Sequence, residues 1–164
     1  MGEEIERKFR VVNTAWREAA KHGRNMDIDQ GYLCANETRS VRVRVCEGQG
    51  GEDRAQITVK GPTEGVTRLE FEYEVPVEDA RQMMKLAGDR RVTKRRHMVT
   101  VGEREWVIDE FFGANAGLVV AELELEDEDA GFERPDWLGE EISGRPEFYN
   151  SNLAVRPFTG WETS

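Results

Sequence analysis

The sequence is poor in cysteine and contains no long apolar segment. Its 164 residues include two cysteines, Cys34 and Cys46, and neither belongs to a Cys-x-x-Cys pair. A disulfide framework or a thiolate-bound zinc is therefore not expected, and we interpret both cysteines as small residues of the core or of strands. No apolar run is long enough to cross a bilayer, and the first residues lack the basic and apolar regions of a secretory signal. We expect a cytoplasmic protein with no membrane partner.

The chain also lacks an excess of positive charge. It has 23 lysines and arginines against 33 aspartates and glutamates, which gives a formal net charge of −10. Broad nucleic-acid binding relies on a basic surface, so we expect no nucleic-acid partner. The net charge does not exclude a site for an anionic ligand, because the positions of the cations matter more than their total.

The length predicts one domain over residues 1–164, with a core at about 3–155 and a tail at 156–164. Short stretches that alternate apolar and polar residues, separated by glycine and proline, are typical of strands. We predict eight of them, at Glu3–Val11, Met26–Leu33, Thr38–Val45, Ala55–Lys60, Thr67–Val75, Arg91–Thr100, Glu105–Phe112 and Leu118–Glu126.

Two segments have the features of helices. Asn13 or Thr14 can cap a helix that runs to His22. A second helix follows Pro76 and ends at Gly88, with apolar residues at helical spacing. We expect short helices and turns between residues 127 and 155.

Charges of one sign gather on single faces of the predicted strands. Side chains two residues apart share a face, so Glu4 lies beside Glu6, and Arg42 beside Arg44. For any one strand, a face in contact with water would explain such charges. Several strands share the pattern, however, and like charges side by side repel. The segregation is more typical of carboxylates that meet a cation and of guanidinium groups that meet an anion.

Phosphate and a divalent metal are the natural partners of such faces. Mg²⁺ and Mn²⁺ prefer carboxylate oxygens, and arginine binds phosphate oxygens with two parallel hydrogen bonds. If the sheet closes into a barrel, the charged faces line its lumen and the apolar faces point outward under helices. We expect the inward set to be Glu4, Glu6, Arg42, Arg44, Lys60, Glu122 and Glu124, and the outward set to include Ile5, Phe9, Val43 and Leu123.

The order of the charged motifs resembles that of the CYTH superfamily, the triphosphate tunnel metalloenzymes. The motifs are Glu4-Ile5-Glu6-Arg7-Lys8, Arg42-Val43-Arg44, Thr58-Val59-Lys60, Glu70-Phe71-Glu72, Lys94-Arg95-Arg96, Asp109 and Glu122-Leu123-Glu124. Gln30-Gly31-Tyr32-Leu33, the run 137–141, Tyr149, Asn150 and Leu153-Ala154 resemble the short bacterial single-domain members in particular.

The resemblance implies an α+β, mainly β fold, a closed antiparallel eight-stranded barrel with flanking helices around a charged tunnel. It implies a single CYTH domain that hydrolyses a linear triphosphate, inorganic triphosphate to pyrophosphate and phosphate, with Mg²⁺ or Mn²⁺ as cofactor. A small-molecule triphosphate is then the partner, and no oligomeric state is indicated. Three alternatives stay open: a class IV-type adenylate cyclase, a thiamine triphosphatase, and a non-enzymatic module that binds polyphosphate or nucleotide.

The resemblance also assigns roles to residues. The metal ligands are Glu4, Glu6, Glu122 and Glu124. The substrate-binding residues are Lys8, Tyr32, Arg42, Arg44, Lys60 and Arg96. The catalytic residues are Glu70, Glu72 and Asp109, which help to place a second metal or the attacking water, and Lys94, which is associated with a C-terminal plug and the leaving phosphate. Two points stay open in the sequence: which of Arg95 and Arg96 points inward, and which pair of Glu122, Glu124 and Glu126 binds the metal.

Overall fold

The computed structural model describes residues 3–48, 51, 53–62 and 64–161. The side chains of Glu3 and Glu4 lie outside the described part, so the predicted metal ligand Glu4 is placed only by its backbone.

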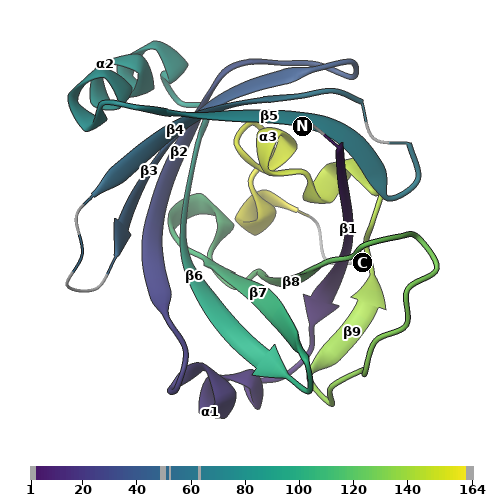
Figure 1. The fold of residues 1–164 in the computed structure, drawn as a ribbon. Helices are drawn as coiled ribbons and strands as arrows, with labels where there is room; N and C mark the ends of the chain where they lie inside the picture. Colours follow the sequence, from purple (N-terminus) through teal and green to yellow (C-terminus); the bar gives the residue numbers. More distant parts are fainter. Residues whose placement is uncertain (1–2, 49–50, 52, 63, 162–164) are drawn as a thin grey trace.

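Nine strands form one antiparallel sheet among these residues. They are β1 (Glu3–Val11), β2 (Asn25–Ala35), β3 (Ser40–Gly48), β4 (Arg54–Lys60), β5 (Thr67–Val75), β6 (Arg91–Val101), β7 (Arg104–Phe111), β8 (Val119–Glu124) and β9 (Leu138–Glu141). The order β5-β4-β3-β2-β6-β7-β8-β1 closes into a ring because β1 also pairs with β5, with Glu3 opposite Leu69 and Ile5 opposite Thr67. The predicted eight-stranded barrel is confirmed, and Figure 1 looks into the ring.

The ninth strand is an addition to the prediction. β9 lies against β1, with Phe9 opposite Glu141, in a segment for which we expected short helices and turns. Its four residues are too few to show a strand period. It is held in place by a close approach, since a Cβ on Gly139 would lie 2.9 Å from the carbonyl oxygen of Arg10. The segment is therefore a strand because it pairs with β1, and not because of a pattern in its own sequence.

The helices agree with the prediction in part. α2 (Val77–Ala87) is confirmed, and Gly88 ends it with a φ of 60°. α1 covers only Trp16–Ala20, so the prediction of a helix from Asn13 or Thr14 to His22 was too long. Asn13 accepts a hydrogen bond from the Ala15 N–H at 2.9 Å, which closes a turn ahead of the helix. α3 (Asn150–Leu153) and three short 3₁₀ turns, η1 (Gly113–Asn115), η2 (Pro146–Phe148) and η3 (Phe158–Gly160), complete the chain.

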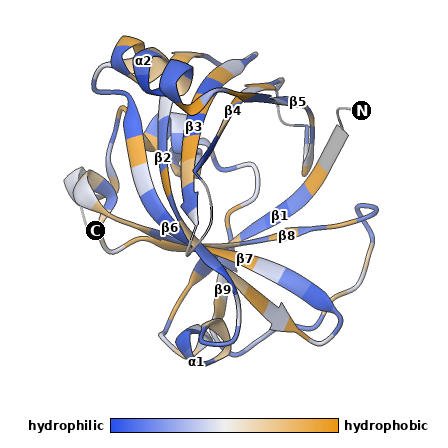
Figure 2. Cartoon of the chain, turned by 60° about the vertical axis from the view of Figure 1, so that its left-hand side comes forward, coloured by the Kyte–Doolittle hydropathy of each residue, from blue (hydrophilic) through white to orange (hydrophobic). Residues whose placement is uncertain are grey.

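The hydrophobic core lies outside the ring, between the sheet and its coverings. Figure 2 shows apolar and polar residues alternating along the strands. Ala80 and Met84 of α2 pack on Val43. On the other side, Phe9 and Leu123 pack in one cluster with three tryptophans: Trp16 of α1, Trp106 of β7, and Trp137, which immediately precedes β9. The outward direction predicted for Val43, Phe9 and Leu123 is confirmed, although an irregular segment supplies much of the cover over the last two.

The outer face of β5 differs from the expectation. Leu69, Phe71 and Tyr73 were predicted to lie under helices, but they are 54%, 44% and 62% exposed. α2 packs mainly against β2, β3 and β4, and of β5 the residue packed against the α2 cluster is Val75, at the end of the strand. The alternation along β5 correctly predicts which side chains point outward. It does not predict whether a helix covers them, because that depends on the position of α2.

The C-terminal segment packs against the barrel. Residues 156–161, which we expected to form part of a tail, bring Trp161 against Phe148 with a ring separation of 5.2 Å. The Phe158 N–H donates to Asn115 Oδ1 at 2.8 Å. No helix in the described ranges is long and apolar enough to span a membrane.

We predict that Gly31→Ala loosens the packing of α2 on β2. A Cβ at residue 31 would lie 2.7 Å from Ala87 Cβ and 2.8 Å from Met84 Sδ, so the helix has to shift. The free energy of unfolding, measured by urea denaturation, should fall by roughly 1–3 kcal/mol. Gly48→Ala is the matched strand control, since its Cβ meets nothing within 4 Å, and its effect should stay within about 0.5 kcal/mol. Equal stability of the two variants would contradict the prediction.

Candidate functional site

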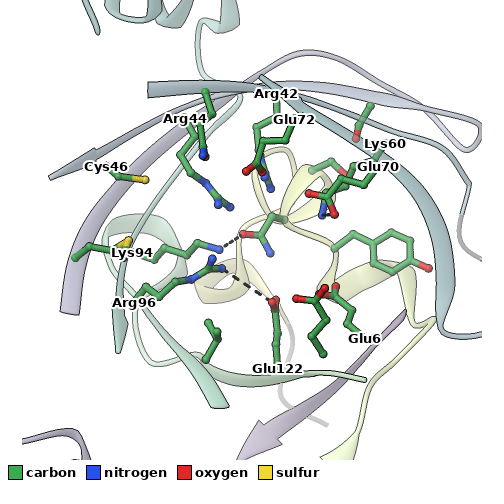
Figure 3. Close-up of a pocket in the computed structure, with 18 of the residues that line it drawn as sticks. Glu6, Arg42, Arg44, Cys46, Lys60, Glu70, Glu72, Lys94, Arg96 and Glu122 are labelled. Atoms are coloured by element: carbon green, nitrogen blue, oxygen red, sulfur yellow. Dashed lines mark hydrogen bonds and ion pairs between the residues drawn. The ribbon is translucent and has the colours of Figure 1, made fainter. Parts of the chain in front are cut away.

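The ring encloses a cavity of about 790 Å³, which is within the range of small-molecule sites. All but two of the fourteen predicted site residues line it. They are Glu6, Lys8, Tyr32, Arg42, Arg44, Lys60, Glu70, Glu72, Lys94, Arg96, Glu122 and Glu124. The exceptions are Asp109, which is buried behind the wall, and Glu4, whose side chain is not described. Figure 3 shows the labelled side chains converging on the lumen from several strands.

One wall of the cavity is built from buried cations on β3 and β6. Arg42 and Arg44 are each 7% exposed, and Lys94 is 1% exposed. Arg42 donates to Thr58 Oγ1 at 3.3 Å, but its Nε is buried without a hydrogen-bond partner among the described residues. An unpaired buried donor is costly. The Arg42 Nε–H group is therefore available to donate a hydrogen bond to an anion in the cavity.

These cations perturb one another. Burial lowers the pKa of the Lys94 ammonium to about 7, against the opposing effect of Asp109. Burial likewise lowers the pKa of Arg44 to about 9, and the charges of Arg42 and Arg96 add to this effect. A negatively charged ligand would relieve this repulsion, because an opposite charge nearby favours the ionised form of each cation.

Asp109 organises the same wall from behind. Its Oδ2 accepts from Lys94 Nζ at 2.7 Å, and its two oxygens accept from Arg96 at 2.8 and 2.9 Å. Burial alone would raise the pKa of this carboxyl, but the two cations outweigh it and hold the pKa far below its usual range. Both oxygens are thus engaged by cations. That Asp109 helps to place a metal or a water stays a prediction.

The opposite wall is built from carboxylates on β1 and β8. The register places Glu6 opposite Glu124, and Lys8 opposite Glu122. Lys8 Nζ lies 3.4 Å from Glu122 Oε1. Arg96 Nη2 lies 4.0 Å from Glu122 Oε2, a pair that Figure 3 marks with a dashed line. Burial would raise the pKa of Glu122, but Lys8 above all lowers it to about 2. Glu122 is therefore ionised, yet its ion pairs are longer than the 2.8 Å pair of Arg95 with Asp27 on the outer surface.

The carboxylate wall fits a hard divalent cation by its chemistry. Its donors are oxygens only, and Mg²⁺ is commonly held by one or two carboxylates together with substrate phosphates. No group of three or more His, Cys, Asp or Glu among the described side chains is already gathered as a metal cluster. Glu4, in phase with Glu6 on β1, is not among those side chains.

A third group of charges lies on β4 and β5. Lys60 Nζ is 3.8 Å from Glu70 Oε2, and Thr58 Oγ1 donates to Glu72 Oε2 at 3.4 Å. These contacts orient the two predicted catalytic carboxylates, Glu70 and Glu72, along the cavity wall. The two carboxylates face the lumen from the strands opposite Lys94 and Arg96 (Figure 3).

The structure shows where the side chains left open by the sequence lie, and which glutamates bind a metal stays a prediction. Arg96 points into the lumen, whereas Arg95 points outward and pairs with Asp27. Glu122 and Glu124 line the cavity, whereas Glu126 lies beyond β8 and pairs with Arg104 at 3.1 Å.

Three residues of the lumen and its wall, Arg68, Gln30 and Asn150, were given no role in the site from the sequence. Arg68 lines the cavity and its Nη2 lies 4.0 Å from Glu6 Oε1. Its period-two phase with Glu70 was a signal that could have found it. Gln30 and Asn150 meet in the wall, with Gln30 Nε2 donating to Asn150 Oδ1 at 2.9 Å. No strand period marks Asn150, because α3 enters the site from an irregular segment.

Comparison with known proteins agrees with this geometry. The CYTH domain family model matches residues 2–153. An inorganic triphosphatase of Acetivibrio thermocellus is 40% identical over 163 residues, which is 99% of each chain. An inorganic triphosphatase of Nitrosomonas europaea is 30% identical over 155 residues, or 93% of this chain and 97% of the relative.

Solved structures share the fold. A crystal structure of an inorganic triphosphatase is 26% identical, has a TM-score of 0.65, and covers 93% of this chain and 94% of its own. A protein of Pyrococcus horikoshii, 24% identical with a TM-score of 0.57 over 77% of this chain and 80% of its own, shares the fold. With a family model that spans nearly the whole sequence, this chain belongs to the CYTH domain family.

Proposed function

We propose that this chain hydrolyses inorganic triphosphate to pyrophosphate and phosphate with the help of a divalent metal ion. The observation that carries the proposal is the division of one cavity into a wall of buried cations and a wall of carboxylates. Two inorganic triphosphatases that match almost the whole chain support the choice of substrate.

The cations would hold the substrate. Arg42 and Arg44 lie two residues apart on β3, or roughly 7 Å along the strand, so their guanidinium groups can contact neighbouring phosphates of a linear chain. Lys8, Lys60 and Arg96 add charges from three other strands. Phosphoryl transfer passes through a loose transition state, so positioning and charge stabilisation dominate catalysis.

The carboxylates of Glu6, Glu122 and Glu124, with Glu4 by its place in the motif, would hold Mg²⁺ or Mn²⁺. Such an ion neutralises phosphate charge and lowers the pKa of a bound water. Glu70 and Glu72 would orient the attacking water from β5. Lys94 would meet the leaving phosphate, Tyr32 would contact the substrate at the same end of the cavity, and Asp109 would keep Lys94 and Arg96 in place.

The carboxylate wall also bears on the alternatives. A module that only binds polyphosphate gains nothing from many anions in its site. Phosphate release from triphosphate, ATP, thiamine triphosphate and pyrophosphate, each with Mg²⁺ or Mn²⁺, separates the hydrolases, and an assay for cyclic AMP detects a cyclase. The two free cysteines, Cys34 and Cys46, are compatible with the cytoplasm that we propose as the site of action.

We predict that hydrolysis of triphosphate stops with a chelator and returns with Mg²⁺ or Mn²⁺. Glu6→Gln and Glu122→Gln should each lower phosphate release at least about a hundredfold, because a ligand of the ion is lost. Both variants should keep the fold, because glutamine has nearly the same size and shape as glutamate, and a thermal unfolding transition close to that of the parent checks this. Glu126→Gln is the matched control from the same alternating run, and it should keep the parent's activity. Full activity of a thoroughly metal-stripped sample would rule out the mechanism.

We predict that Arg44→Lys lowers kcat/KM for triphosphate at least about tenfold, or about 1.4 kcal/mol of transition-state stabilisation. Lysine keeps the charge but loses the planar fork. Arg95→Lys changes an outward residue of the same kind and serves as the control, with unchanged steady-state rates. Pyrophosphate reaches fewer cations and should be a poor substrate for the parent. Either a fully active Arg44→Lys variant or a preference for pyrophosphate would refute this assignment.

A further inference from the structure

Two neutral amides connect the cation wall to the C-terminal segment. Gln30 is fully buried, and its Oε1 accepts from Arg44 Nε at 2.9 Å. Its Nε2 donates to Asn150 Oδ1 at 2.9 Å and to Tyr32 Oη at 3.0 Å. Asn150 Oδ1 also accepts from Lys94 Nζ at 2.8 Å. A continuous chain of hydrogen bonds thus runs from Arg44 through both amides to Lys94.

The directions of these hydrogen bonds are fixed by the groups at the two ends. Arginine and lysine side chains only donate. The Gln30 oxygen must therefore face Arg44, and the Asn150 oxygen must face Lys94. The Gln30 nitrogen is then left to face the Asn150 oxygen, which matches the observed contact. Reversal of either amide would break two hydrogen bonds or more.

Asn150 is held in place by the packing of its own segment. It begins α3, whose Leu153 is fully buried together with Phe148 and Tyr32. The Leu153 and Ala154 N–H groups donate to the carbonyls of Tyr149 and Asn150 at 2.8 and 3.0 Å. In Figure 1, α3 is seen inside the outline of the ring. The amide chain therefore has a rigid attachment on the side of the C-terminal segment.

Arg44 needs a neutral hydrogen-bond acceptor because the neighbouring cations of the same wall repel it. Arg44 is buried, and the like charges of Arg42 and Arg96 disfavour its ionised form. Among the described residues, Gln30 Oε1 is the acceptor that holds the Arg44 guanidinium by a hydrogen bond. It engages Nε and leaves both Nη groups for a ligand.

We propose that Gln30 and Asn150 are positioning residues that couple docking of α3 to the orientation of Arg44 and Lys94. The inference rests on the proposed function, in which these two cations grip the triphosphate. Neither amide needs to touch the reacting atoms. Their effect passes through the two cations, and it depends on both amides together, because each one fixes the orientation of the other.

A double-mutant cycle tests the coupling. Gln30→Leu and Asn150→Leu should each lower kcat/KM for triphosphate about tenfold, and the double variant should also lose about tenfold instead of about a hundredfold, because one chain of contacts is broken in all three. Asn152→Leu is the matched control on the same helix. Asn152 is exposed and donates to the Pro146 carbonyl, so its loss should leave the rate unchanged.

Two further measurements separate positioning from a general loss of structure. The dissociation constant for triphosphate without metal, measured by calorimetry on the folded variants, should rise about tenfold for Gln30→Leu. Hydrogen exchange at the Leu153 and Ala154 amides should speed up in the same variant, although residue 30 lies on another element. Both readouts remain informative if the parent binds triphosphate but does not hydrolyse it, so failure of the proposed function would be recognised separately.

Losses that multiply to about a hundredfold in the double variant would show independent roles and overturn the coupling. Unchanged α3 exchange in Gln30→Leu would overturn it as well. If Gln30→Leu does not fold, Asn150→Ala carries the same test from the side of the helix, with the same expected rise in the dissociation constant.

Discussion

Repulsion among buried positive charges is the constraint on which the rest of this structure depends. Arg42, Arg44, Lys94 and Arg96 are withdrawn from water on two strands, and burial disfavours the charged forms of Lys94 and Arg44. The fold offsets the repulsion with one fully engaged carboxylate, Asp109, and with neutral acceptors such as Gln30. Arg42 Nε has no hydrogen-bond partner among the described residues, so the wall keeps a donor that an anionic ligand could use.

A charged interior requires the hydrophobic core to lie elsewhere. In most small barrels apolar side chains fill the lumen, whereas here they lie on the outer face and must be shielded by other elements. α2 shields β2, β3 and β4, and the aromatic cluster around Trp106 shields β1, β7 and β8. The helices and the irregular segment before β9 thus bury the apolar outer face of the sheet, while the carboxylates and cations stay inside the ring.

The period-two pattern was enough to predict most of the frame and most of the lumen. It assigns Arg42 and Arg44 to one face and Val43 to the other because strand geometry leaves no alternative. The pattern does not predict elements whose presence or length depends on packing against other parts of the chain. β9 exists because Gly139 allows a close approach to β1, and α1 is shortened by the turn at Asn13. Asn150 enters the site from outside the sheet, so no periodicity within a strand points to it. Glu4 shows the pattern, and its side chain lies outside the described residues.

Closure of the ring depends on a short pairing between β1 and β5, here called the seam. β1 meets β5 only over Glu3–Ile5 and Thr67–Leu69 among the described residues, and the next residue of β1, Glu6, already faces Glu124 of β8. The seam and a lumen carboxylate are therefore consecutive along one strand. Glu6 also lies 4.0 Å from Arg68, which belongs to β5. One side chain of the amino-terminal strand therefore takes part both in the charge balance of the lumen and in a contact between the two strands that close the ring.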